Sequence, residues 1–280
     1  MEIKLLYDLP KGINPEDGFV FSPPFFLGVT DGVSGLYMPD EGPILFNGKS
    51  GGRMVSDVVT ETFLSVTGGS SIEEILIRAN EKVYKTQSSL GFYGEPRTDL
   101  LASTTFAIAK LDDEIEIIQC GDAFAVLELR GGKVLSTRNQ VLQHDTEARK
   151  IIAELMKKHG EDRTKMWHEF SPILSQMRLR NVNKKTGSGF GLLNGQSVFK
   201  EFWQRIVIPR EEAKLLLLFT DGLIYYPDSG DEQFLAKKVL SLYRQGGLRS
   251  ILEETRKKES TEKEMGHIDH AEATAIAIEF

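Results

Sequence analysis

Four acidic sites stand out because each lies beside a glycine or another small residue where a strand is expected to end. They are Glu16-Asp17, Asp31-Gly32, Asp122 and Asp221-Gly222. Asp31 follows the apolar run FFLGVT and Asp221 follows LLLLFT, so each carboxylate comes directly after a strand that we expect to be buried. Asp-Gly after a strand is also a common turn, and each site taken alone fits that simpler interpretation.

Carboxylates gathered at one edge of a packed sheet repel one another, and their pKa values rise unless a cation lies between them. Oxygen ligands select Mg²⁺, Mn²⁺ or Ca²⁺ over Zn²⁺, and the sequence lacks the Cys and His spacing of a zinc site. The pattern therefore favours a site for hard divalent cations. The single cysteine, Cys120, lies in the apolar segment EIIQC, and we expect it to be buried and to have no nucleophilic role.

Short strands and paired helices must position these carboxylates. Alternating or continuous apolar residues predict strands at 3–7, 19–21, 25–30, 104–110, 114–120, 123–129, 134–136, 206–219 and 274–280. Apolar residues three and four apart predict helices at 52–64, 72–88, 145–179 and 233–256. We expect residues 104–136 to form one antiparallel meander. Blocks of strands with paired helices favour an α+β fold with helices outside antiparallel sheets.

The composition narrows the class of protein. The chain has 280 residues and a formal net charge of −7, from 34 Lys and Arg against 41 Asp and Glu. This charge argues against nucleic acid as a partner. No apolar run approaches the roughly 18 residues that a membrane span needs, and the N-terminus lacks a signal-peptide pattern. One cysteine excludes a scaffold held by several disulfides. We therefore expect a cytoplasmic protein with one domain over residues 1–280 and no membrane partner.

Five segments, in order along the chain, resemble motifs of the metal-dependent Ser/Thr protein phosphatases of type 2C, the PPM family. They are NPEDGFVF around Glu16-Asp17, FFLGVTDGVSG at 25–35, STTFAIAKLDDEIEIIQCGDAFAVLELRGGKV at 103–134, LLLFTDGL at 216–223 and AEATAIAIEF at 271–280. The resemblance implies a four-layer α-β-β-α sandwich, with two central antiparallel sheets flanked by helix pairs. It also implies a variable lobe or flap around residues 138–200.

The resemblance further implies that two Mn²⁺ or Mg²⁺ ions share a water or hydroxide that attacks phosphoserine or phosphothreonine in a protein substrate. By motif, Asp31 would bridge both ions, the Gly32 carbonyl would bind one, and Asp221 would bind the other. Asp17 would act directly or through water, and Asp122 matches a residue that holds a looser third ion. The remaining motif carboxylate, Glu16, would orient metal-bound water.

Two departures from the family pattern affect this site. The Arg that grips the substrate phosphate would fall at Gly12, and the nearest cation is Lys11, which we expect to contact phosphate. The last metal-binding Asp would fall at Ala271. We expect Glu272, with its longer arm, to replace that ligand, with Asp269 or His270 as the alternatives.

Three functions remain open at this point. The first is a monomeric protein serine/threonine phosphatase. The second is a catalytically impaired protein of the same fold that acts as a binding or regulatory module, for which Gly12 and Ala271 are the signs. The third is a phosphatase for small phosphate monoesters. Asp31 and Asp221 favour an enzyme, because carboxylates that repel one another bring no benefit to a scaffold.

Overall fold

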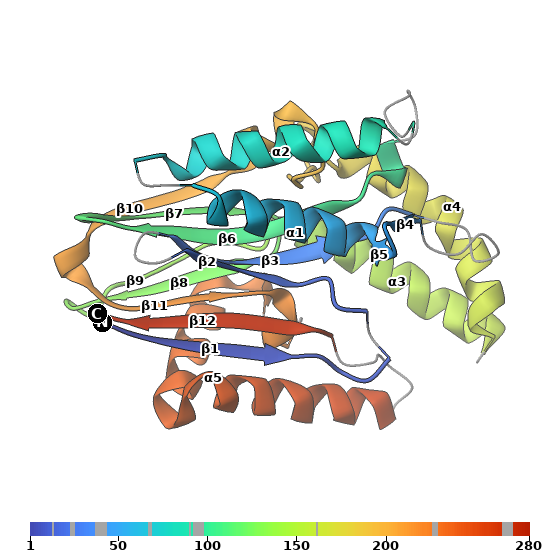
Figure 1. Cartoon of the computed structure of the whole chain (residues 1–280). Coiled ribbons are helices and arrows are strands. Elements are labelled where there is room, and N and C mark those ends of the chain that lie inside the picture. The colour runs from blue at the N-terminus through green and yellow to red at the C-terminus, as the bar shows by residue number, and fades with distance from the viewer. Residues whose placement is uncertain are drawn as a thin grey trace.

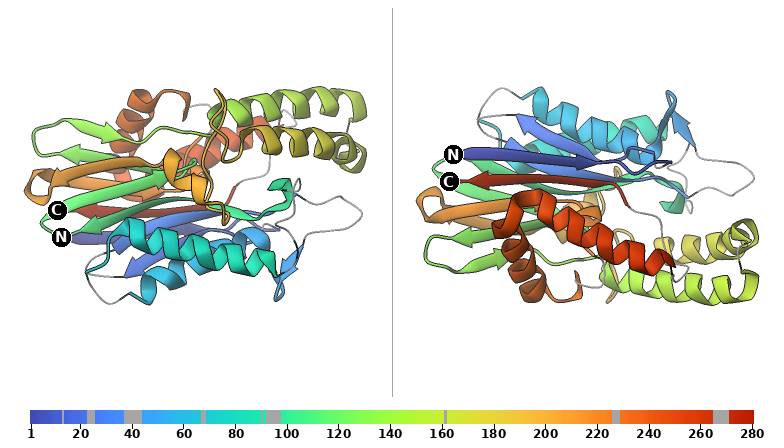
Figure 2. Two further views of the ribbon diagram at one scale, coloured as in Figure 1. Left: turned by 90° about the horizontal axis from the view of Figure 1, so that it is seen from above. Right: turned by 90° about the horizontal axis from the view of Figure 1, so that it is seen from below.

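The computed structural model describes residues 1–12, 14–22, 26–36, 44–66, 69–89, 91, 98–160, 162–225, 229–264 and 271–280. Two five-stranded antiparallel sheets lie face to face, with helices outside them (Figure 1). Helices α1 and α2 cover one sheet and α5 covers the other, whereas α3 and α4 lie at one end of the sandwich (Figures 1 and 2). The α+β fold with two central antiparallel sheets is thus confirmed.

Each sheet combines strands from distant parts of the chain. The first, which we call the β3 sheet, has the order β10 (Gln204–Pro209), β7 (Glu114–Cys120), β6 (Ser103–Leu111), β3 (Phe26–Val33), β2 (Gly18–Ser22). The second, the β11 sheet, has the order β1 (Glu2–Asp8), β12 (Ala273–Glu279), β11 (Ala213–Phe219), β8 (Phe124–Leu129), β9 (Val134–Ser136). A small hairpin of β4 (Leu45–Phe46) and β5 (Lys49–Ser50) precedes α1.

Side-chain caps and glycines define the helix limits. The helices are α1 (Gly51–Leu64), α2 (Ile72–Ser88), α3 (Leu142–His159), α4 (Arg163–Asn181) and α5 (Glu232–Glu264), with short 3-10 turns η1 (Thr98–Leu100), η2 (Ser197–Phe202), η3 (Arg210–Glu212) and η4 (Asp221–Leu223). Ser71 and Glu74 form a capping box at the start of α2. Helix α5 is kinked at Gly246 and Gly247, and Gly247 has a φ of 72°, which glycine adopts readily. Within the described residues, no helix is long and apolar enough to cross a membrane.

Three apolar clusters join the four layers. One lies between α1, α2 and the β3 sheet, one between the sheets, and one between the β11 sheet and α5. Strand β11 contributes to two of them, because Leu216 and Leu218 face the other sheet while Leu217 and Phe219 face α5. Alternate side chains of a strand point to opposite faces, so the continuous apolar run is explained by burial on both sides.

Two expectations about strand connections are wrong. Residues 104–136 do not form one meander, because β6 and β7 pair in the β3 sheet while β8 and β9 pair in the β11 sheet. The crossing occurs at Gly121, whose φ is 84°. The predicted strand 206–219 is also two strands in different sheets. It breaks at Pro209, which has no N–H to continue a ladder and is followed by η3.

Candidate metal centre

The predicted carboxylates lie at the same end of the sandwich, although they come from distant parts of the sequence. Asp17 immediately precedes β2, and Asp31 lies near the end of β3. Asp122 lies in the turn between β7 and β8, and Asp221 opens η4 directly after β11. Antiparallel strands of both sheets begin or end here (Figure 1). The charges of these four side chains affect one another's pKa values, so the topology brings them close together.

A fifth carboxylate, Asp145 in the first turn of α3, joins them. Burial raises the pKa of Asp145 to about 7, and the charge of Asp221 adds to this rise while Arg149 opposes it. The sequence analysis did not single out Asp145, because an acidic residue in a first helical turn is common. No local spacing distinguishes it, and only the fold brings it close to Asp221. We refer to Asp17, Asp31, Asp122, Asp145 and Asp221 as the carboxylate cluster.

The members of this cluster differ in exposure. Asp17 is only 3% exposed, whereas the other four keep part of their surface in solvent. Burial raises the pKa of Asp17 to about 8, and the negative charges of Glu272 and Asp221 contribute to the rise. Burial also raises the pKa of Asp122 well above its ordinary value, with further contributions from Asp221 and Asp145. Without a cation, the fold therefore keeps protons on carboxylates that would be ionised in water.

Asp31 and Asp221 lie close enough for each carboxyl group to affect the pKa of the other. Burial raises the pKa of Asp31 well above its ordinary value, and repulsion from Asp17, Asp221 and Asp122 raises it further. A cation between these side chains would relieve this repulsion.

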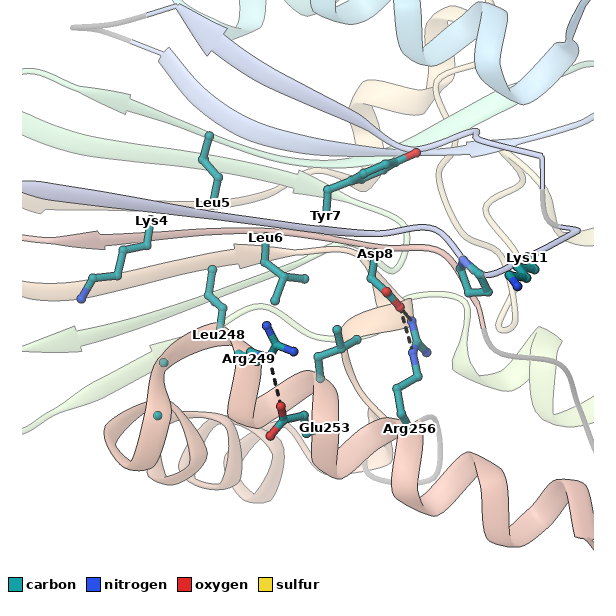
Figure 3. Close-up of a pocket in the computed structure, with 14 residues that line it drawn as sticks. Lys4, Leu5, Leu6, Tyr7, Asp8, Lys11, Leu248, Arg249, Glu253 and Arg256 are labelled. Carbon is teal, nitrogen blue, oxygen red and sulfur yellow. Dashed lines mark hydrogen bonds and ion pairs between the residues drawn. The ribbon is translucent and has the colours of Figure 1, made fainter.

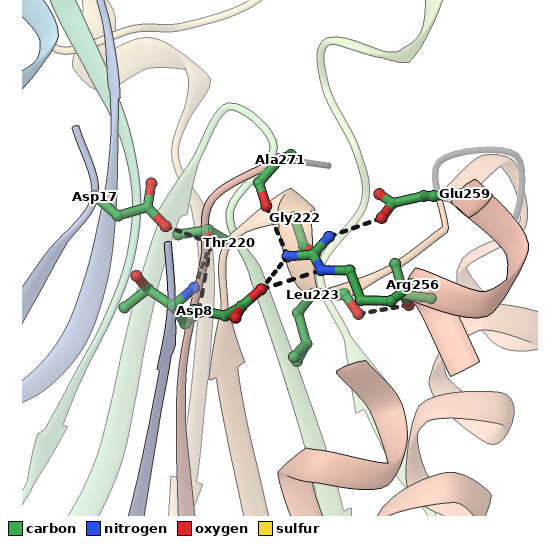
Figure 4. Close-up of polar contacts among 10 residues, drawn as sticks. Asp8, Asp17, Thr220, Gly222, Leu223, Arg256, Glu259 and Ala271 are labelled. Atoms are coloured by element: carbon green, nitrogen blue, oxygen red, sulfur yellow. Dashed lines mark hydrogen bonds and ion pairs between the residues drawn. The ribbon is translucent and has the colours of Figure 1, made fainter. Parts of the chain in front are cut away.

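Thr220 connects Asp17 to the opposite sheet. Its hydroxyl donates to Asp17 Oδ2 at 2.8 Å and accepts from the Thr274 N–H at 3.0 Å, and its own N–H donates to the Thr274 carbonyl at 2.9 Å. Figure 4 shows the bond between Thr220 and Asp17. The residue before Asp221 thus determines where the Asp17 carboxylate lies.

Gly32 allows close approach of two other segments to Asp31. A Cβ atom at this position would lie 2.5 Å from the Gly52 carbonyl and 2.6 Å from the Glu16 carbonyl. Ser34 follows in the chain, and its hydroxyl donates to Glu16 Oε1 at 2.5 Å while accepting from the Gly52 N–H at 3.2 Å. Glu16 is thus held beside Gly32 and Gly52 by a protein partner, and its role in orienting water stays a prediction.

Glu272 lies just before β12 and is 9% exposed. Its Oε1 accepts from the Tyr7 hydroxyl at 2.7 Å, and its Oε2 accepts from the backbone N–H groups of Glu16 and Asp17 at 2.7 and 3.1 Å. Both oxygens therefore already have protein donors. The alternatives considered in the sequence, Asp269 and His270, lie outside the described residues.

Lys11 lines a groove of about 940 Å³ between β1 and α5, together with residues such as Lys4, Arg249 and Arg256 (Figure 3). The Lys11 side chain is exposed. Its contact with a phosphate group stays a prediction.

Cys120 is fully buried, and burial raises the pKa of its thiol far above the ordinary value. A thiol that keeps its proton is a poor nucleophile. The expectation of a buried, structural cysteine is confirmed.

The fit of this centre to divalent cations depends on its donor chemistry. Among the described residues, no three His, Cys, Asp or Glu side chains already converge at the spacing of a metal cage. The cluster nevertheless offers only oxygen donors, and repulsion among its carboxylates adds to the burial that raises the pKa values of Asp31 and Asp122. Hard cations such as Mg²⁺ and Mn²⁺ take oxygen ligands and would remove the repulsion, so the residues present fit such ions.

No protein-family model matches the sequence, and no curated protein matches it. Solved structures do match over nearly the whole chain. The serine/threonine phosphatase Stp1 from Staphylococcus aureus has a TM-score of 0.52 at 14% identity, covering 100% of this chain and 94% of that chain. PstP/Ppp from Mycobacterium tuberculosis has a TM-score of 0.54 at 16% identity, covering 100% and 98%.

A third match is the catalytic domain of the serine threonine protein phosphatase PstP in complex with two manganese ions. It has a TM-score of 0.53 at 15% identity, covering 99% of this chain and 96% of that chain. Structural likeness at such low identity shows the fold and leaves the roles of individual residues open. The chain has the fold of the bacterial PPM-type serine/threonine phosphatases, as its five motifs predicted.

Proposed function

We propose that this protein is a metal-dependent phosphatase that hydrolyses phosphoserine and phosphothreonine in proteins with two Mn²⁺ or Mg²⁺ ions. The observation that carries the proposal is the gathering of Asp17, Asp31, Asp122, Asp145 and Asp221 at one end of the sandwich, where like charges repel one another. A fold retained only for binding gains nothing from such repulsion. Support also comes from the manganese complex of the structurally similar PstP domain.

In this proposal, the chain supplies the ligands from both sheets. Asp31 would bridge the two ions, the Gly32 carbonyl would bind one, and Asp221 would bind the other. Asp17, held by Thr220, would contribute directly or through water. When bound, the two ions would supply a water of lowered pKa and neutralise phosphate oxygens.

Other residues would act around these ligands. Asp122 would hold a looser third ion, and Glu16, held by Ser34, would orient water toward the phosphate. Lys11 would contact the substrate phosphate as a point charge. The helices α3 and α4, which extend beyond the sheets at this end, would form the lobe that shapes access for a phosphoprotein loop (Figure 2). We also propose that the protein is a cytoplasmic monomer.

The test is release of phosphate from p-nitrophenyl phosphate and from a phosphothreonine peptide at millimolar Mn²⁺. Asp31→Asn and Asp221→Asn should each reduce the rate at least about a hundredfold, because each removes a charged ligand while keeping the shape of the side chain. Asp112→Asn is the matched control, because Asp112 lies at the opposite end of the sandwich in the exposed turn after β6.

Three outcomes would separate the alternatives. Equal inactivity of the wild type and both variants would favour the binding module. Activity on p-nitrophenyl phosphate but on no phosphopeptide would favour a small-molecule phosphatase. Activity that does not depend on Mn²⁺ or Mg²⁺ would contradict the proposed mechanism.

A further inference from the structure

The Glu272 carboxylate connects the two sheets at the end of the sandwich that holds the carboxylate cluster. Tyr7 comes from β1, which pairs with β12, and the Tyr7 Cα is opposite that of Thr274. Glu16 and Asp17 lead into β2 of the other sheet. A single side chain thus collects one hydroxyl from the β11 sheet and two successive backbone N–H groups from the segment that carries Asp17.

The main chain next to Glu272 is also held in place, on the side that faces α5. The carbonyl of Ala271 accepts from Arg256 Nη2 at 2.7 Å, and the same guanidinium donates to Asp8 and toward the Gly222 carbonyl (Figure 4). The Tyr7 side chain points away from α5, whereas Asp8 and Arg256 lie on the α5 side (Figure 3). Glu272 therefore starts from a fixed main chain and reaches across the sandwich to its donors.

The three hydrogen-bond donors around Glu272 limit its ability to bind a cation. A charged oxygen that accepts two backbone N–H groups makes strong, directional bonds, and these donors would have to be given up or shared for the same oxygen to bind a cation. The second oxygen is occupied by Tyr7 in the same way. The two N–H groups belong to Glu16 and to Asp17 itself, so the bonds hold the main chain from which the Asp17 side chain branches.

We propose that Glu272 is a positioning residue and not a metal ligand: it holds the N–H groups of Glu16 and Asp17 so that the Asp17 carboxylate faces Asp31 and Asp221. This assignment replaces the direct ligand role expected from the sequence. It rests on the proposed function only where metal binding is concerned, because the hydrogen bonds exist without a metal. Tyr7 in turn orients Glu272.

The first test uses metal-free protein and measures amide hydrogen exchange by NMR. In Glu272→Met, the Glu16 and Asp17 amides should exchange at least tenfold faster, because the methionine side chain has no oxygen to accept their bonds. Tyr7→Phe should change the same two amides by a smaller factor, and it keeps the test available if Glu272→Met does not fold. Unchanged exchange at both amides in a folded Glu272→Met protein would overturn the proposal.

Glu279, at the far end of β12, provides a matched control. Tyr243 donates to Glu279 Oε1 at 2.6 Å, which repeats the pairing of Tyr7 with Glu272. Glu279→Met and Tyr243→Phe should leave exchange at Glu16 and Asp17 unchanged. Faster exchange at these amides in the control variants would show a general loosening of β12 and would also overturn the assignment.

The second test measures Mn²⁺ binding by calorimetry in wild type, Glu272→Met, Asp17→Asn and the double variant. Glu272→Met should weaken binding about tenfold, as loss of an outer partner does. The double variant should bind no more weakly than Asp17→Asn, because Glu272 acts through Asp17. Losses that multiply would identify Glu272 as an independent ligand and contradict the proposal. Wild-type protein that binds no Mn²⁺ would instead refute the proposed function, while the exchange test would still decide the role of Glu272.

Discussion

At the scale of single residues, the carboxylate cluster gathers like charges that its own side chains do not neutralise. Asp31 and Asp221 repel each other, and Asp17 is buried close to Glu272. Polar partners orient the cluster without neutralising it, as the Thr220 hydroxyl does for Asp17. Sites that retain such repulsion trade stability for function.

A first prediction follows for Asp31. Asp31→Asn should stabilise the metal-free protein at pH 7 by about 1–2 kcal/mol, because it removes a repelled carboxyl group. Urea unfolding in the presence of EDTA measures this change. The same variant should lose Mn²⁺-dependent activity.

Asp112→Asn again serves as the control, and it should change the free energy of unfolding by less than about 0.5 kcal/mol. If Asp31→Asn were less stable than wild type without metal, the repulsion inferred for the cluster would be refuted.

At the scale of elements, close backbone contact determines where η4 lies. A Cβ atom at Gly222 would lie within 1.7 Å of the Glu272 carbonyl oxygen. Thr255 and Arg256 of α5 hold the same turn from outside, through the carbonyls of Leu223 and Gly222. Asp221 is therefore placed by contacts on both sides of the turn.

The second prediction concerns this contact. Gly222→Ala should destabilise the protein by at least about 2 kcal/mol, because a backbone carbonyl must move to make room. It should also weaken Mn²⁺ binding, since Asp221 is adjacent. Thermal unfolding and Mn²⁺ titration measure both effects.

Gly131→Ala is the matched control. A Cβ atom there would meet nothing within 4 Å, and Gly131 does not have a positive φ. A loss of stability as large as that of Gly222→Ala would show that the effect is not specific to the contact with Glu272.

Arg178 attaches helix α4 to the end of the sandwich that holds the carboxylate cluster. Its guanidinium donates to the carbonyls of Ser34 and Asp99, each at 3.1 Å. Ser34 in turn holds Glu16. One side chain thus links α4 to the segment that follows Asp31 and Gly32.

The third prediction is that Arg178→Met destabilises the protein by about 2 kcal/mol, because two carbonyl groups lose their donor. Arg180→Met is the control from the same helix, since Arg180 is 53% exposed and pairs with Glu147 at the surface. That change should cost at most about 1 kcal/mol. Equal losses in urea unfolding would contradict a special role for Arg178.

At the scale of the whole molecule, the cluster should make stability depend on pH and metal together. The pKa of Asp17 is raised to about 8 and that of Asp145 to about 7 in the folded protein. Between pH 4 and these values the folded state therefore binds more protons than the unfolded state. Stability must then fall as the pH rises.

The fourth prediction is that the metal-free protein loses stability from about pH 4 to about pH 8, on the order of a few kcal/mol from these groups. Mn²⁺ should restore this stability near pH 8, because it binds the ionised carboxylates of the folded protein. Calorimetric unfolding at several pH values, with EDTA or with Mn²⁺, measures both effects.

Asp17→Asn isolates the contribution of Asp17, and it should flatten the pH dependence of the metal-free protein. A metal-free wild type whose stability rises steadily from pH 5 to pH 8 would show that these carboxylates ionise normally.

Much of the fold could be predicted from local pattern. Apolar residues that recur every two residues, or every three to four, predicted most strands and helices to within a few residues of their observed bounds. Examples are β9 and α2. The predicted helix 145–179 is two helices, because α3 ends at Gly160 before α4 begins. Other failures occurred where the chain changes sheet, at Gly121 and Pro209. A hairpin turn and a crossing between sheets use the same residue types, so the local sequence does not distinguish them.

The sequence by itself determined that Asp31 and Asp221 follow buried apolar runs, because apolar periodicity and an abrupt Asp-Gly are local features. Only the tertiary structure decided that Asp145 joins them and that Glu272 holds the N–H groups of Glu16 and Asp17, 256 and 255 residues away. Such contacts depend on which strands become neighbours. That choice is made by burial of side chains across the whole sandwich and leaves no signal in the spacing of the residues themselves.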